Sequence, residues 1–180
     1  MSDLSCFKTY DIRGEVNVNI DADIVYRIGR AISQHLAAKS VVIGYDARET
    51  SPIFASAMAE GVKDSGSSVI DIGLAGTEEM YWAVSEFGAC AGIEITASHN
   101  PINYNGAKIV KSKSQPLNEE TDFKPIKKLA EKAAFSSPRY RGTMIDRSVE
   151  ARKSYVNRVL SFIEIDKLSP LKIVVNSGNG

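Results

Sequence analysis

Short apolar runs alternate along the chain with longer segments whose apolar residues recur every three or four positions. A helix is predicted after Asp21, because the following apolar residues fall on one helical face: Ile24, Val25, Ile28, Ile32 and Leu36. Residues 41–43 predict a buried strand that ends at Gly44. Ser51 and Pro52 predict the start of a second helix that ends at Gly66.

The same alternation continues through the middle of the chain. Residues 69–72 predict a strand, Thr77 starts a third helix, and residues 90–97 predict another strand. Asn105-Gly106 is a turn signal that leads into an antiparallel strand over 107–111, and a further helix covers 118–133. This order places the chain in the α/β class, with a layered mixed sheet and helices on both faces.

Residues 135–142 (FSSPRYRG) form the best boundary, because they are polar, contain proline and glycine, and lack periodicity. We expect residues 1–142 to form one α/β domain. Residues 143–180 then hold a linker helix over 148–163 and a strand over 173–175, followed by NSGNG. The buried side of that helix is predicted to be Tyr155, Val156, Val159 and Ile163. The strand-then-glycine pattern repeats that of residues 41–48, so we expect the start of a second, similar α/β domain that is incomplete in this chain.

Composition and charge narrow the class of protein. Lys plus Arg is 22 and Asp plus Glu is 22, so the chain lacks the basic surplus typical of nucleic-acid binders. Cys6 and Cys90 lie far apart in no metal-binding pattern, which fits a reducing compartment. No apolar run is long enough for a signal peptide or a membrane span. We therefore expect a cytoplasmic protein that binds neither nucleic acid nor membrane.

Three polar clusters stand at predicted strand ends or turns, where α/β proteins place their sites. They are residues 9–14 (TYDIRG), residues 44–48 (GYDAR) and residues 96–101 (TASHNP), the last followed by Asn103, Asn105, Gly106 and Lys108. The third cluster is the densest.

The third cluster offers groups suited to phosphate chemistry. The Ser98 hydroxyl can carry a phosphoryl group, while His99, Asn100 and Lys108 can donate hydrogen bonds to phosphate oxygens. Phosphoryl transfer depends mainly on positioning and charge stabilisation, which these side chains can supply. The sequence therefore predicts a phosphate or sugar-phosphate site.

Other interpretations of the same residues stay open. Arg13 and Arg48 can make bidentate phosphate contacts, or they can pair at the surface with Asp11 and Asp46, where an ion pair contributes little. Taken alone, Lys108 is a charged residue that guards an edge strand.

Ser98 taken alone is a polar loop residue. A serine hydrolase is disfavoured because adjacent side chains on an extended chain point to opposite sides, and because the GxSxG spacing is absent.

Two motifs in order resemble those of the α-D-phosphohexomutases. TASHNP followed by residues 104–108 (YNGAK) resembles the phosphoserine loop of that family, and residues 10–14 (YDIRG) resemble its N-terminal motif. The resemblance covers essentially the whole chain, including GxDxR at 44–48 and the NSGNG ending. CFKTYDIRG and IGLAGTEEMYWA resemble the bacterial phosphomannomutase branch, which serves GDP-mannose and surface-polysaccharide synthesis.

The resemblance implies a reversible isomerase. Ser98, phosphorylated at rest, would donate its phosphoryl group to mannose 6-phosphate and recover the other one from a bisphosphorylated sugar. Mg²⁺ would bind the Ser98 phosphate oxygen. Lys108 is implied as general acid/base with Arg13 supporting it, while Tyr10, His99 and Asn100 would orient the serine loop and the sugar phosphate; Arg48 belongs to the same substrate and phosphate loop.

The resemblance also implies that essential parts lie beyond Gly180, namely the magnesium loop, the sugar-recognition loop and the main phosphate-binding loop. We therefore expect residues 1–180 alone to be inactive as a mutase, and the intact protein to be active on hexose phosphates as a monomer or weak homo-oligomer. The alternatives are a phosphoglucomutase or phosphoglucosamine mutase, and a non-catalytic sugar-phosphate binding module.

Overall fold

The computed structural model describes residues 4–176, which contain a six-stranded sheet of order β1-β5-β4-β2-β3-β6. Its strands are β1 (Ile12–Glu15), β2 (Ser40–Tyr45), β3 (Ser68–Leu74), β4 (Ala91–Ile95), β5 (Tyr104–Lys111) and β6 (Met144–Asp146). Strands β4, β2, β3 and β6 are parallel, and β5 runs antiparallel to both β4 and β1. The predicted mixed sheet is confirmed.

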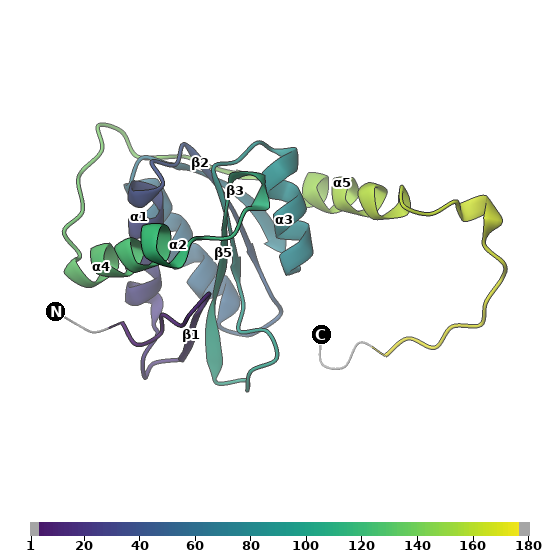
Figure 1. The fold of residues 1–180 in the computed structure, drawn as a ribbon, viewed down its shortest axis with the longest axis horizontal. Coiled ribbons are helices and arrows are strands. Elements are labelled where there is room, and N and C mark those ends of the chain that lie inside the picture. The colour runs from purple at the N-terminus through teal and green to yellow at the C-terminus, as the bar shows by residue number, and fades with distance from the viewer. Residues whose placement is uncertain (1–3, 177–180) are drawn as a thin grey trace.

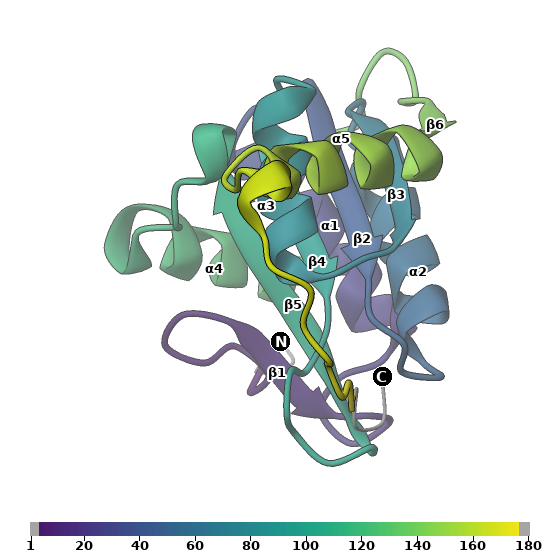
Figure 2. The ribbon, with the colours of Figure 1, turned by 90° about the vertical axis from the view of Figure 1, so that its right-hand side faces the viewer.

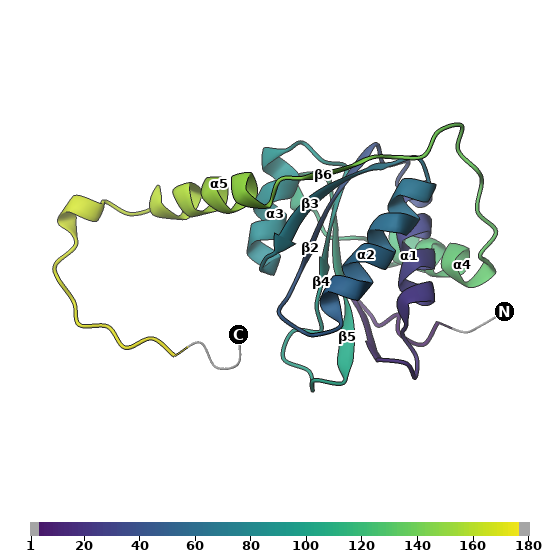
Figure 3. The ribbon, with the colours of Figure 1, turned by 180° about the vertical axis from the view of Figure 1, so that it is seen from behind.

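Helices cover both faces of this sheet (Figures 1 and 3). On one face lie α1 (Ala22–His35), α2 (Ser51–Asp64) and α4 (Lys124–Lys132), whose apolar side chains join one core cluster. On the other face α3 (Thr77–Glu86) and the start of α5 (Ser148–Leu160) bury a smaller cluster. The predicted layers are therefore confirmed.

Local signals explain where the helices begin and end. The Asp21 side chain accepts a hydrogen bond from the Ile24 amide at 2.8 Å, which satisfies a free N–H group at the start of α1. Pro52 stands in the first turn of α2, where its missing N–H costs nothing. Gly66 follows α2 with a φ of +86°, a left-handed conformation that favours glycine.

Two predicted breaks lie inside strands instead. Gly44 is part of β2, and Asn105 and Gly106 are part of β5, so the strand end and the turn predicted there are wrong. At Gly106 a Cβ atom would stand 1.9 Å from the Ile12 carbonyl oxygen. The glycine is needed because β1 approaches its backbone closely, and a sequence signal for a turn cannot reveal that contact.

The C-terminal part differs from the prediction in one unpredicted strand and one exposed helix face. Strand β6 pairs in parallel with β3. In α5 the buried residue is Ala151, while the predicted inner side chains Val156, Val159 and Ile163 are exposed and Tyr155 is half-buried. The reason is that α5 contacts β3 and α3, which it crosses in Figure 2, and the chain then extends away from the layers (Figures 1 and 3).

The strand predicted at 173–175 is absent from the described residues: this stretch has no regular structure and its side chains are exposed. A strand needs a neighbour to satisfy its backbone hydrogen bonds, and no described segment pairs with this one. Ser177–Gly180 of the NSGNG motif lie outside the described residues. The division at residue 142 stays a prediction, although β6 and the start of α5 contact the sheet of the first unit.

Helices α1 and α2 cross with their backbones almost in contact. A Cβ atom on Gly61 would stand 2.1 Å from the Tyr26 carbonyl oxygen, so we expect Gly61→Ser to destabilise the chain by about 3 kcal/mol despite the better helix propensity of serine. Urea unfolding at a fixed pH measures the change.

Gly76→Ser is the matched control, because a Cβ atom at Gly76 meets nothing closer than 3.8 Å and serine is favoured at this helix cap. We expect no loss of stability there. Equal free energies of unfolding for the two variants would contradict the tight helix crossing.

Candidate functional site

The loops that follow β2 and β4 meet at one edge of the sheet. Parallel neighbours end at the same edge, and the Asp46 amide donates to the Ile95 carbonyl oxygen at 3.0 Å. The Thr96 amide donates in turn to the Gly106 carbonyl oxygen at 3.1 Å. The second and third polar clusters of the sequence are thereby brought together at the carboxyl end of the sheet, where open α/β sheets bind ligands.

Ser98 occupies an unusual backbone conformation on this edge. Its φ is +55°, which is a left-handed conformation that costs a non-glycine residue on the order of 1 kcal/mol. Its amide donates to the Thr96 hydroxyl at 2.8 Å, and its own side chain is exposed. The turn also brings the Ser98 hydroxyl to 3.3 Å from His99 Nδ1, so the expectation that these two side chains point apart is wrong.

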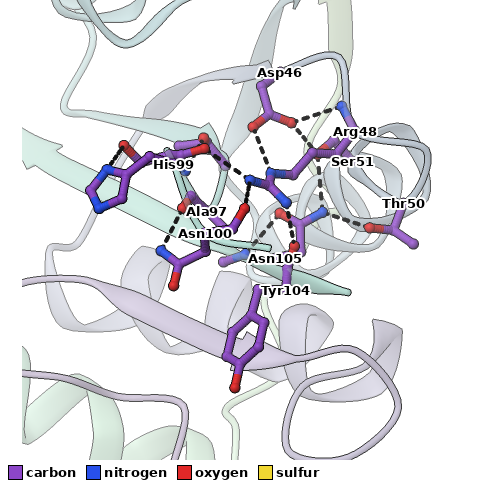
Figure 4. Close-up of polar contacts among 12 residues, drawn as sticks. Asp46, Arg48, Thr50, Ser51, Ala97, His99, Asn100, Tyr104 and Asn105 are labelled. Atoms are coloured by element: carbon purple, nitrogen blue, oxygen red, sulfur yellow. Dashed lines mark hydrogen bonds and ion pairs between the residues drawn. The ribbon is translucent and has the colours of Figure 1, made fainter. Parts of the chain in front are cut away.

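The Arg48 guanidinium holds the serine loop in place (Figure 4). Its Nη2 donates to the carbonyl oxygens of Ser98 and Asn100, at 2.9 and 2.7 Å. Its Nη1 donates to those of Pro101 and Tyr104, at 2.8 and 3.0 Å. One planar cation thus binds four carbonyl groups of residues 98–104, and charge-assisted hydrogen bonds of this kind are strong.

Arg48 is itself held in place by Asp46. Asp46 lies 3.4 Å from Arg48 Nε, and its Oδ1 accepts from the Arg48 amide at 3.1 Å and from the Ser51 hydroxyl at 2.6 Å. Buried Asn105 donates to the hydroxyls of Thr50 and Ser51, which ties β5 to the start of α2. The predicted pair of Arg48 with Asp46 exists, but the arginine is largely buried and its two Nη atoms are engaged by the loop.

A cavity of about 600 Å³ opens at this place, lined by Asp46, Ala47, Arg48, Ser98, His99, Asn100, Pro101 and Ile102. The structure therefore gathers four predicted site residues around one space: Ser98, His99, Asn100 and Arg48. The Ser98 and His99 side chains are exposed at this cavity, whereas the Nη atoms of Arg48, the Asn100 side-chain amide and the backbone amides of Ser98 and Asn100 already donate within the loop.

Three other predicted site residues lie apart from that cavity. Tyr10 is 83% exposed, and Arg13 pairs with Asp11 at 2.6 Å. Lys108 lies on β5, two residues from Gly106, which is the partner of Arg13 in the β1–β5 register. Arg13 and Lys108 consequently share one face of the sheet. Within residues 4–176 no hydrogen bond or ion pair joins any of the three to the serine loop.

Glu94 is a residue that sequence reasoning missed. It lies on β4, is only 1% exposed, and neither of its carboxylate oxygens has a hydrogen-bond partner among the described residues. Its pKa is raised to about 9, mainly by burial and also by the nearby carboxylates of Asp46, Glu79 and Glu78, against the lowering effect of Lys108. A single acidic residue inside the apolar run 91–97 was the signal available in the sequence.

The described residues do not form a metal site by themselves. No group of three or more His, Cys, Asp or Glu side chains in residues 4–176 is arranged to hold a metal ion. Asp46, the carboxylate at the cavity, is engaged by Ser51 and Arg48. A phosphate oxygen on Ser98 could bind the predicted Mg²⁺, but this part of the chain supplies no further shell.

Comparison with known proteins decides the family. The family model for domain I of phosphoglucomutase/phosphomannomutase, an alpha/beta/alpha domain, matches residues 5–137. The chain belongs to the phosphoglucomutase/phosphomannomutase family. The resemblance carried by TASHNP and YDIRG is thereby confirmed.

Relatives within this family match the chain along its length. A phosphomannomutase from Salmonella montevideo is 43% identical over 180 residues, which are the whole of this chain and 40% of that protein. One from Klebsiella pneumoniae is 46% identical over 159 residues, covering 87% of this chain and 100% of that one. A solved family protein from Burkholderia thailandensis superposes with a TM-score of 0.79 at 30% identity, over 91% of this chain and 37% of that one.

The chain spans about two fifths of the length of most of these phosphomannomutases. The part of the mutase fold present is the first α/β/α layer structure and the serine loop. Among the described residues, no helix is long and apolar enough to cross a membrane.

We expect Arg48→Lys to loosen the serine loop of this mutase domain. A single ammonium group cannot reach four carbonyls, so stability should fall by about 2 kcal/mol and the amides of residues 98–104 should exchange hydrogen faster. Hydrogen exchange resolved by residue measures this. Arg139→Lys, at an exposed position, is the control and should leave the loop unchanged; unaltered exchange in Arg48→Lys would contradict the holding role.

Glu94 gives the stability of the domain a defined pH dependence. Its pKa is about 9 in the folded chain and about 4.5 when unfolded, so between these values the unfolded chain has lost a proton that the folded chain retains. Stability therefore falls as pH rises through this window, by about 1.4 kcal/mol per pH unit from this group. In Glu94→Gln we expect that slope to disappear, as measured by urea unfolding at about pH 6 and about pH 8. An unchanged slope would show that Glu94 is ionised in the folded chain.

Proposed function

We propose that the intact protein is a phosphomannomutase that interconverts mannose 6-phosphate and mannose 1-phosphate through a phosphoserine at Ser98. The observation that carries the proposal is the presentation of Ser98. Its side chain is exposed at a cavity that His99 also lines, on a left-handed residue that Arg48 holds through the loop carbonyls. Such a rigid, exposed hydroxyl suits a group that gives and takes a phosphoryl group.

In the first half of the proposed reaction the bond between phosphorus and Ser98 Oγ breaks, and a bond to the O1 hydroxyl of mannose 6-phosphate forms. The proton of that hydroxyl passes to Lys108, the proposed general base. After the bisphosphorylated sugar turns over, its 6-phosphoryl group returns to Ser98 Oγ, and Lys108 gives the proton back to O6. Arg13 supports Lys108, while Tyr10, His99 and Asn100 orient the loop and the sugar phosphate.

Magnesium is the cation we expect at the Ser98 phosphate, where it would neutralise charge. The residues described here do not complete its shell, so its other ligands belong to parts of the polypeptide outside residues 4–176. The names of the relatives support the mannose sugar. A cytoplasmic enzyme that feeds GDP-mannose and surface-polysaccharide synthesis is part of the proposal, as the motifs CFKTYDIRG and IGLAGTEEMYWA imply. A glucose or glucosamine phosphate remains the alternative substrate within the family, and a non-catalytic sugar-phosphate binding module is the alternative outside enzymes.

Intact-mass analysis tests the phosphoserine. After incubation of the intact protein with mannose 1,6-bisphosphate and Mg²⁺, we expect it to gain the mass of one phosphoryl group, and its Ser98→Ala variant to gain none. Ser161→Ala removes another exposed serine hydroxyl and should still be modified. A phosphoryl group that persists in Ser98→Ala, or an unmodified intact wild-type protein, would overturn the proposal.

We also expect residues 1–180 alone to show no measurable turnover of mannose 6-phosphate, because residues 4–176 form no metal shell and the resemblance implies that the sugar-recognition loop is not among them. A coupled assay for mannose 1-phosphate formation measures this. Appreciable turnover by this chain would mean that the serine-loop domain is sufficient for catalysis.

A further inference from the structure

Three residues on adjacent strands stand side by side on the α3 face of the sheet. Gly44 of β2 pairs with Glu94 of β4, and Glu94 pairs with Lys108 of β5. Residues paired across neighbouring strands point to the same face, with Cβ atoms about 5 Å apart. The buried carboxyl of Glu94 is therefore flanked by a residue without a side chain and by a lysine.

Gly44 provides the space that the Glu94 carboxyl fills. A Cβ atom at Gly44 would stand 2.5 Å from Glu94 Oε2, so any other residue there would collide with the carboxyl group. The side chain thus lies over β2, fully enclosed, with both oxygens unpaired. An isolated buried carboxylate is costly, and such a group must either hold its proton or find a cation.

Lys108 is the cation that can pair with the Glu94 carboxylate, because the two residues are partners in the strand register. The charged and titratable groups around Glu94 are Asp46 after β2, Glu78, Glu79 and Tyr81 on α3, and Lys108 on β5. Arg152 of α5 is already bound to Glu79, at 2.8 and 2.9 Å. Among the described residues, Lys108 has no ion pair within 4.0 Å of its own, and it is half-buried on the same face as Glu94.

We propose that Glu94 is a positioning residue that forms a proton-coupled pair with Lys108. With Glu94 ionised, the carboxylate draws the Lys108 ammonium group back onto the sheet; with Glu94 protonated, Lys108 is free to reach toward the serine loop. Within the pair one proton moves between the Lys108 nitrogen and a Glu94 oxygen, so that ammonium and carboxylate become amine and carboxylic acid without net change in charge. The coupling itself follows from the strand register, while its role in catalysis rests on the proposed function of Lys108.

The coupling can be measured on the 180-residue chain by NMR titration of the Lys108 side-chain nitrogen and the Glu94 carboxyl carbon. Removing the anion in Glu94→Gln should lower the pH at which Lys108 loses its proton by about one unit. Removing the cation in Lys108→Met should raise the pH at which Glu94 loses its proton. Glu49→Gln and Lys172→Met, both at exposed positions, are the matched controls and should shift neither titration.

Coupling is reciprocal, so both shifts must appear together. Unchanged titrations in both variants, or a shift in only one of them, would overturn the pair. If Glu94→Gln fails to fold, Lys108→Met still tests the pair, because that substitution replaces only a half-buried side chain. An unchanged Glu94 titration in Lys108→Met would then be enough to overturn the proposal.

A separate experiment tests whether the pair of Glu94 and Lys108 acts in phosphoryl transfer. Where Ser98 accepts a phosphoryl group from mannose 1,6-bisphosphate, the pH midpoint of the rate should move in Glu94→Gln by the same amount as the Lys108 titration. A merely structural role for Glu94 would lower the rate at every pH and leave the midpoint in place. Coupled titrations together with an intact protein that never phosphorylates Ser98 would keep the pair and reject the proposed function.

Discussion

The contact between the Arg48 guanidinium and four carbonyl groups of the serine loop is the interaction on which the site depends. Ser98 holds a left-handed backbone conformation that an isolated loop would leave. The hydrogen bonds that oppose this relaxation come from a residue fifty positions earlier in the chain. The sheet makes that contact possible, because β2 and β4 are parallel neighbours and deliver their following loops to one edge.

The sheet also sorts the predicted site residues into two groups. Ser98, His99, Asn100 and Arg48 line a cavity at the carboxyl edge, whereas Arg13 and Lys108 stand on the α3 face of the sheet. Glu94 stands beside the second group, next to Lys108 in the strand register.

Sequence periodicity and caps were enough to predict α1, α2 and the layered α/β class, because Asp21 and Pro52 act within one helical turn. The errors arise where contacts between residues far apart in the sequence determine the local structure. Gly106 looked like a turn residue, and its actual role is to admit the backbone of β1. The short strand β6 carries no periodic signal, and the four partners of Arg48 are far from it in sequence. The serine loop could be predicted as a motif and Arg48 as a site residue, but not that Arg48 holds the loop through its carbonyl groups.

The packing of Glu94 over Gly44 links the evolution of two positions that are fifty residues apart. A methyl group at position 44 and a carboxyl group at position 94 cannot occupy the same space, so a side chain can be gained at 44 only together with a shorter or differently directed residue at 94. Among homologous sequences these positions should therefore covary. Members with an apolar residue at 94 would have room at 44 and no acid beside the lysine, so we expect two electrostatic types within the family.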